Sequence, residues 1–120
     1  MKVYGIVLLV MLVACSRTPA SVSLCAVAQT PERYIGIPLT ISGMAKMGRH
    51  GSTLSDPSCP DRQLGFVGPP TKDWSDPFHE ALAGTLAPGQ EPIRVMVTGR
   101  VAPTSGLPSY VFQVTTGARQ

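Results

Sequence analysis

Cysteine and histidine are the residue types in this chain best suited to chemistry, and both are scarce. The 120 residues include three cysteines, Cys15, Cys25 and Cys59, and two histidines, His50 and His79. Thiolate and imidazole groups bind zinc well, so a zinc-binding domain is one alternative. No C-x-x-C or H-x-x-x-H spacing occurs, and the intervals between these residues match no zinc motif. The sequence therefore predicts no metal and no other cofactor.

A histidine, a serine and a carboxylate lie close together in the sequence, at His50, Ser52 and Asp56. Nucleophilic catalysis uses such a set, with the imidazole as the base and the carboxylate as its orienting group. No nucleophile-elbow pattern of glycines surrounds Ser52, however, and all three residue types are common in turns. Asp56 precedes Pro57 and is expected to form an Asx-type turn. We therefore predict that the protein is not an enzyme, with an envelope enzyme that uses His50 as the alternative.

The first fifteen residues carry the most specific signal in the chain. Lys2 precedes an apolar run over residues 3–14, which is shorter than the about 20 residues that a membrane span needs. A charged start, a short apolar run and small residues before the cut are typical of a secretory signal. The run ends in a pattern that resembles the box cut by the bacterial lipoprotein signal peptidase, Leu12-Val13-Ala14-Cys15. The resemblance implies that residues 1–14 are removed and that Cys15 is acylated on its sulfur and on its new amino group.

Acylation at Cys15 predicts a membrane-anchored protein of the bacterial cell envelope. Two or more acyl chains anchor a protein stably, at ~0.8 kcal/mol per buried methylene. Ser16 and Arg17 follow the cysteine, and no Asp does. By resemblance to the sorting rules of enterobacteria, this favours the outer membrane, with the domain facing the periplasm. An ordinary signal peptide, with Cys15 incidental, is the alternative.

Cys25 and Cys59 remain as an even pair once Cys15 carries lipid. In an oxidising compartment such a pair predicts a disulfide. The bond would close a loop of about 35 residues, worth ~3–4 kcal/mol in the chain-entropy model. Two free thiols, or a metal pair completed by a histidine, are the alternatives.

Removal of residues 1–14 leaves 106 residues, enough for one domain with a single modest core. The formal net charge falls from +3 to +2 because Lys2 is lost. The basic residues are scattered and form no run, so we expect no nucleic-acid interface. Residues 15–21 begin with small and turn-forming types, which predicts a tether and leaves residues 22–120 as the domain.

The pattern over residues 22–120 predicts a mainly β domain. Glycine and proline each occur 12 times in the chain, which indicates many turns. Alternation of apolar and polar residues predicts five short strands, near residues 37–42, 50–54, 64–66, 93–98 and 110–115.

Two helices are predicted beside the strands. A short one follows Ser21 or Ser23 and is ended by Pro31, because the residue before a proline is pushed out of the helical region. The second lies between the third and fourth strands and starts with Asp76 as N-cap and Pro77 as first residue. Its apolar face is predicted to hold Phe78, Ala81, Leu82 and Leu86.

The predicted elements run in the order of three strands, one helix and two strands. This is the order of a small five-stranded OB-like barrel, here with a short N-terminal helix added. Closing the sheet would hide the strand edges of so small a β protein. An open antiparallel sheet with one helix packed across it is the alternative fold.

Three motifs resemble a group of small bacterial envelope proteins, many of which carry lipoprotein signals. The first is Pro31-Glu32-Arg33-Tyr34-Ile35-Gly36 before an alternating strand, and the second is His50-Gly51 followed by Leu54-x-Asp56-x-x-Cys59-Pro60. The third is the late strand Val95-Met96-Val97-Thr98-Gly99-Arg100. The resemblance covers about residues 24–115. It implies a fold and a compartment, and it brings no reaction with it.

Arg49, His50 and Arg62 are predicted on or beside the second and third strands, the face with which many OB-like barrels bind ligands. Trp74 and Tyr110 add aromatic side chains, and together the five predict a shallow site for a partner protein or an anionic polymer. A solvated face with core aromatics is the alternative. The sequence thus predicts a lipid-anchored envelope protein that acts as a binding or structural module.

Overall fold

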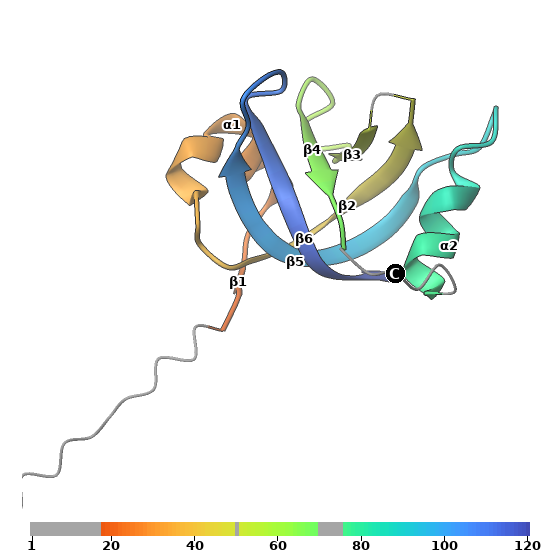
Figure 1. The fold of residues 1–120 in the computed structure, drawn as a ribbon, viewed down its shortest axis with the longest axis horizontal. Coiled ribbons are helices and arrows are strands. Elements are labelled where there is room, and N and C mark those ends of the chain that lie inside the picture. Colours follow the sequence, from red (N-terminus) through yellow and green to blue (C-terminus); the bar gives the residue numbers. More distant parts are fainter. Residues whose placement is uncertain (1–17, 50, 70–75) are drawn as a thin grey trace, which may run out of the picture.

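The computed structural model describes residues 18–49, 51–69 and 76–120. Their elements run in the order β1 (Ala20–Ser21), α1 (Leu24–Gln29), the 3-10 helix η1 (Pro31–Tyr34), β2 (Leu39–Gly48), β3 (Gly51–Ser55), β4 (Gln63–Val67), α2 (Pro77–Gly84), β5 (Ile93–Pro103) and β6 (Tyr110–Arg119) (Figure 1). The domain is mainly β, as predicted, and the six strands within these ranges form one sheet.

Strand pairing runs around the sheet and returns to its starting strand. β2 pairs with β3, β3 with β4, β4 with β6, β6 with β5, and β5 pairs back with β2. The β4–β6 pair is parallel and the other four pairs are antiparallel. Figure 1 shows β2 and β5 as long, strongly curved strands, with β6 running across β5 in this view. Each of these five strands therefore has a neighbour on both sides over part of its length.

The prediction of five strands is wrong by one, because β1 adds a sixth. β1 has two residues and pairs in parallel with the start of β2. The Ala20 amide donates to the Pro38 carbonyl and the Val22 amide donates to the Thr40 carbonyl, both at 3.1 Å. β1 lies inside residues 15–21, the segment predicted to be a tether. No alternation marks it, so its strand conformation depends on these two bonds to β2.

Both predicted helices form, and α2 is shorter than its apolar pattern indicated. The Asp76 carboxylate accepts a hydrogen bond from the Phe78 amide at 2.8 Å, and Pro77 is the first helical residue. The helix ends at Gly84, so Leu86 lies beyond it and is 52 % exposed. The placement of Leu86 on the buried face was therefore wrong. Ser23 precedes α1 at the N-cap position without a side-chain hydrogen bond.

The core is built from the alternating inward positions of the strands, covered at the ends by the two helices. In β5 these positions are Val95, Val97 and Val101, each at most 1 % exposed. The other strands and the helices contribute the remaining buried side chains, namely Leu24, Val27, Leu39, Ile41, Ala45, Leu54, Leu64, Phe66, Phe78, Leu82, Phe112 and Val114. The period of two expected of a half-buried strand is thus present in β2 and β5 and in the first half of β6, where it ends at Val114.

A buried hydroxyl fastens the end of α2 to β2. Thr85 is 2 % exposed and follows the last residue of α2. Its Oγ1 donates to the Leu82 carbonyl at 2.7 Å and accepts from the Met47 amide at 2.8 Å. One side chain therefore satisfies a carbonyl at the end of the helix and an amide of the sheet.

Replacing Thr85→Val keeps the shape of the side chain and removes its oxygen. The Met47 amide then loses its partner in the interior, which costs about 1–3 kcal/mol of the free energy of unfolding. Urea denaturation measures the change. Thr116→Val, at an exposed position of β6, is the matched control and is expected to stay within about 0.5 kcal/mol of the parent. Equal stability of the two variants would contradict the role given to Thr85.

Cys25 of α1 and Cys59 of the β3–β4 loop lie at disulfide distance, with their Cα atoms 5.9 Å apart and a sequence separation of 34. The loop is also held by its own backbone. The Cys59 amide donates to the Asp56 carbonyl, and the Arg62 amide donates to the Cys59 carbonyl, both at 3.0 Å. The Cys pair therefore joins α1, near the start of the domain, to an ordered turn between two core strands.

The double variant Cys25→Ala/Cys59→Ala is expected to lose about 3–4 kcal/mol of unfolding free energy, because the unfolded chain regains the entropy of the open loop. Urea denaturation measures the loss. Thiol titration of the denatured, unreduced protein supplies the second check. Two reactive thiols at these positions would show that the bond does not form.

Candidate functional site

The residues predicted to bind a ligand do not come together at one point. Cys15, His50 and Trp74 lie outside the described residues. Arg49 lies in the turn between β2 and β3, whereas Arg62 lies directly before β4, and both are exposed. Since β3 runs from one of these turns to the other, the two arginines flank opposite ends of that strand.

The outer side of β3 and β4 lies between these arginines. Leu54, Leu64 and Phe66 are buried, so the residues that alternate with them face outward. We call this surface the β3–β4 face, made of Thr53, Ser55, Gln63, Gly65 and Val67. Its side chains are uncharged, and Val67 is 52 % exposed.

The connection between β5 and β6 stands beside this face. The Thr104 hydroxyl bonds to the Pro108 carbonyl, and the Thr104 amide donates to the Ser109 carbonyl at 2.8 Å. Pro108 contacts the strand, since a Cβ built on Gly65 would lie 3.5 Å from Pro108 Cγ. Leu107, at the tip, is 96 % exposed. The turn therefore presents a large apolar side chain next to the β3–β4 face.

Two turn-forming residues, Gly106 and Pro108, flank Leu107 in the sequence, and no role was predicted for this leucine. Tyr110, which was grouped with the binding residues, packs partly against the core.

The catalytic set suggested by the sequence is not assembled within the described residues. Ser52 and Asp56 lie at opposite ends of β3, about 13 Å apart along an extended strand. Asp56 instead forms the predicted Asx-type turn, since its Oδ1 accepts from the Ser58 amide at 2.8 Å. Hydrogen bonds from Ser58, and more weakly the positive charge of Arg94, lower the pKa of Asp56 below its ordinary value of 3.8.

No group of three or more His, Cys, Asp or Glu side chains that could hold a metal ion occurs among the described residues. Cys25 and Cys59 face each other. His79 lies on α2 with its ring perpendicular to that of Phe78, at a centroid distance of 6.3 Å. The zinc alternative thus has no assembled ligand set in the part of the chain that the structure describes.

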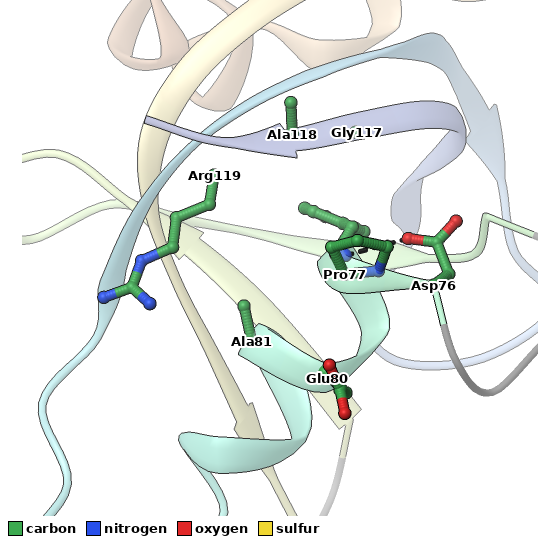
Figure 2. Close-up of a pocket in the computed structure, with 8 residues that line it drawn as sticks. Asp76, Pro77, Glu80, Ala81, Gly117, Ala118 and Arg119 are labelled. Carbon is green, nitrogen blue, oxygen red and sulfur yellow. Dashed lines mark hydrogen bonds between the residues drawn. The ribbon is translucent and has the colours of Figure 1, made fainter.

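A groove of about 710 Å³ lies between α2 and the end of β6 (Figure 2). Figure 2 shows the helix wall below the strand, with the Arg119 side chain extending on the helix side and the Ala118 methyl group on the other. The helix contributes Asp76, Pro77, Phe78, Glu80 and Ala81, and the strand contributes Gly117, Ala118 and Arg119. Its two walls are about forty residues apart in sequence, which is why local pattern gave no indication of it.

A second groove, of about 550 Å³, lies further back along the same strand. Its walls are the end of β4 and the middle of β6, with Val67, Gly68 and Pro69 on one side and Gln113, Val114 and Thr115 on the other. The two grooves therefore border successive stretches of β6.

Comparison with protein-family models gives no match, and comparison with curated proteins gives none. Within the described ranges, no helix is long and apolar enough to cross a membrane. The resemblance to envelope lipoproteins thus stays a prediction from the motifs.

The lowered pKa of Asp56 predicts a pH-dependent contribution to stability. Because the folded value lies below the unfolded one, the ionised carboxylate stabilises the fold above about pH 4, and this contribution is lost as the pH falls through the folded value. The stability gap between the parent and Asp56→Asn should thus be present near neutral pH and vanish in acid. Urea denaturation over a pH series measures it, with Asp61→Asn as control for loss of a loop charge. A gap that stays constant into acid would rule out the ionised Asx turn.

Proposed function

We propose that this protein is a lipid-anchored component of the bacterial cell envelope whose domain acts as a binding or structural module. The observation that carries the proposal is the Leu12-Val13-Ala14-Cys15 box at the end of a short apolar run. Acylation of Cys15 would place the domain at a membrane surface, with the outer membrane favoured because no Asp follows the cysteine. The Cys25–Cys59 pair at disulfide distance is in keeping with an oxidising compartment.

The proposed architecture of the domain is an OB-like barrel. Its support is the circuit of pairings from β2 through β3, β4, β6 and β5 back to β2, with α2 between β4 and β5 in the order of the chain. β1 is then a two-residue addition outside the barrel. The closed sheet would leave few free backbone groups along the five main strands.

Binding is favoured over catalysis by the kind of surface that the sheet presents. The β3–β4 face corresponds to the ligand-binding face of OB-folds, with Arg49 and Arg62 at its ends and Leu107 beside it. The two separated arginine cations and the exposed leucine are suited to bind an envelope protein or an anionic polymer. No nucleic-acid partner is proposed, since the basic residues form no cluster in sequence.

The anchor is tested by labelling cells with radioactive palmitate and by mass spectrometry of the mature protein. We expect label in the parent, a mature amino terminus at acylated Cys15, and recovery with the membrane fraction. Cys15→Ser should lose the label and the membrane association, because a single hydroxyl offers no thioether linkage. Cys25→Ala is the matched control and should keep both.

An unacylated mature chain that starts elsewhere would overturn the proposed anchor. Recovery of unlabelled parent protein in the soluble cytosolic fraction would do the same.

A further inference from the structure

A pocket of about 530 Å³ opens on the outer side of β2, at the point where β1 ends and α1 begins. This volume lies within the range of about 300–1,000 Å³ that is typical of small-molecule sites. Its walls come from the segment that joins β1 to α1, from β2, from the residue after β3 and from one side chain of β5. The lining residues are Ser21, Val22, Ser23, Leu24, Thr40, Ser42, Asp56 and Met96.

The pocket is separate from the two grooves along β6. Along the sheet, β5 and β6 separate β2 from the first turn of α2, which packs against Gly117. On its other side, β1 runs parallel to β2, so residues 18–19 lie toward Pro38 and not toward Ser42. The pocket therefore lies away from the start of α2 and away from the segment that leads into β1.

A gap in the pairing of β2 leaves backbone groups free at the floor of the pocket. β1 pairs with β2 up to Thr40, and β3 pairs with it from Met44 onward. The Thr40 carbonyl accepts from the Val22 amide at 3.1 Å, so the backbone groups of Thr40 point away from β5. Because these directions alternate along a strand, the N–H and C=O groups of Ser42 point into the gap between β1 and β3. Ser42 therefore offers one backbone donor and one backbone acceptor to a ligand.

The walls on the two sides of this gap are joined to each other. On one side, Ser23 and Leu24 lead directly into Cys25. On the other, the Asp56 carbonyl accepts from the Cys59 amide at 3.0 Å. Cys25 and Cys59 lie at disulfide distance, so this pair ties the start of α1 to the turn that carries Asp56. The width of the pocket is therefore set by the fold.

The polar groups of the pocket match a ligand that carries several hydroxyl groups. Ser21, Ser23 and Ser42 are exposed, and a serine hydroxyl both donates and accepts, as a sugar hydroxyl does. The Asp56 carboxylate accepts charge-assisted hydrogen bonds, and its lowered pKa keeps it ionised near neutral pH. Met96 is 42 % exposed and supplies an adaptable apolar surface for the C–H side of a sugar ring.

The charges around the pocket favour a neutral ligand. The Asp56 carboxylate belongs to the lining and would repel an anion. The positive charge of Arg94 acts on that carboxylate, and it would oppose a protonated amine at the same place. A neutral ligand avoids both repulsions and still forms hydrogen bonds with the hydroxyl and carboxylate groups.

We propose that this pocket binds one neutral saccharide unit, with Ser42 and Asp56 hydrogen-bonded to its hydroxyl groups and Met96 in contact with its ring. The pocket shares no residue with the β3–β4 face, so the proposal goes beyond the function proposed above. It does not depend on acylation of Cys15.

NMR titration of the protein with glucose, galactose and N-acetylglucosamine tests the class of ligand. At least one of these neutral sugars should give saturable shifts of the Ser42 and Asp56 amides and of the Met96 methyl group. Glucuronate and glucosamine, the anionic and cationic counterparts of glucose, should bind more weakly than the tightest neutral sugar. Tightest binding of glucosamine would assign the pocket to a cation and overturn the neutral ligand. If no neutral sugar gives saturable shifts in the pocket, the proposal fails.

Comparison of glucose with the disaccharide cellobiose separates a free sugar from the end of a glycan chain. Saturation by both supports a site that accepts a chain end, whereas saturation by glucose alone supports a site for free sugars.

Replacing Asp56→Asn keeps the shape of the side chain and removes its charge. It should weaken binding of the tightest neutral sugar about fivefold to tenfold at neutral pH, the effect of one hydrogen bond to a charged group. Asp61→Asn is the matched control and should bind as the parent does, and circular dichroism checks that both variants fold. Equal affinity of Asp56→Asn and the parent would contradict the role given to this carboxylate.

Two variants of Met96 test the contact with the sugar ring. Met96→Ala removes most of the apolar surface and should weaken binding about fivefold, whereas Met96→Leu keeps that surface and should stay within about twofold of the parent. Equal binding by the two variants would show that the ring does not rest on β5.

Arg62→Ala and Cys15→Ser separate this proposal from the function proposed above. Both variants should bind the sugar as tightly as the parent does, because neither residue lines the pocket. Loss of sugar binding in Arg62→Ala would place the sugar on the β3–β4 face and overturn the site proposed here.

Discussion

The pairing of β2 with β5 is the constraint on which the rest of this structure depends. Residues 39–45 lie antiparallel to residues 93–99, so the pair joins the two halves of the chain. Leu39, Ile41 and Ala45 then face the same interior as Val95 and Val97. On the outer side, Thr40 and Thr98 share a hydrogen bond of 3.0 Å between their hydroxyls. Without this pair the sheet would have two free edges and an uncovered apolar face.

The unequal lengths of the strands create the surfaces that this protein can offer to a partner. β4 has five residues and β6 has ten, and a groove lies between the end of β6 and α2. α2 forms the other wall of that groove, and it is held at both ends. Phe78 packs under Gly117 at its start, and Thr85 bonds to Met47 after its end. The helix is thus fixed in position beside the end of β6.

The proposed anchor and β6 lie at opposite ends of the sequence. β1 leads into the start of β2, whereas β6 is the last strand. In Figure 1, β1 lies on the opposite side of the domain from α2. The groove between α2 and β6 is therefore remote from β1, the first described strand after Cys15.

The sequence by itself determined the features that depend on neighbours along the chain. The cap and first residue of α2, the Asx turn at Asp56, the even pair of cysteines and the alternating cores of the strands were all predictable, because each depends on residues only a few positions apart or on a count. The lipid signal belongs to the same class, and it stays a prediction. Tertiary structure alone decided β1, the continuation of β2 beyond Gly43, and the separation of Arg49 from Arg62. A strand extends as far as it finds a hydrogen-bonding partner, and contacts between distant segments determine that partner. The ends of the strands and the groove between α2 and β6 therefore cannot be predicted from the pattern of neighbouring residues.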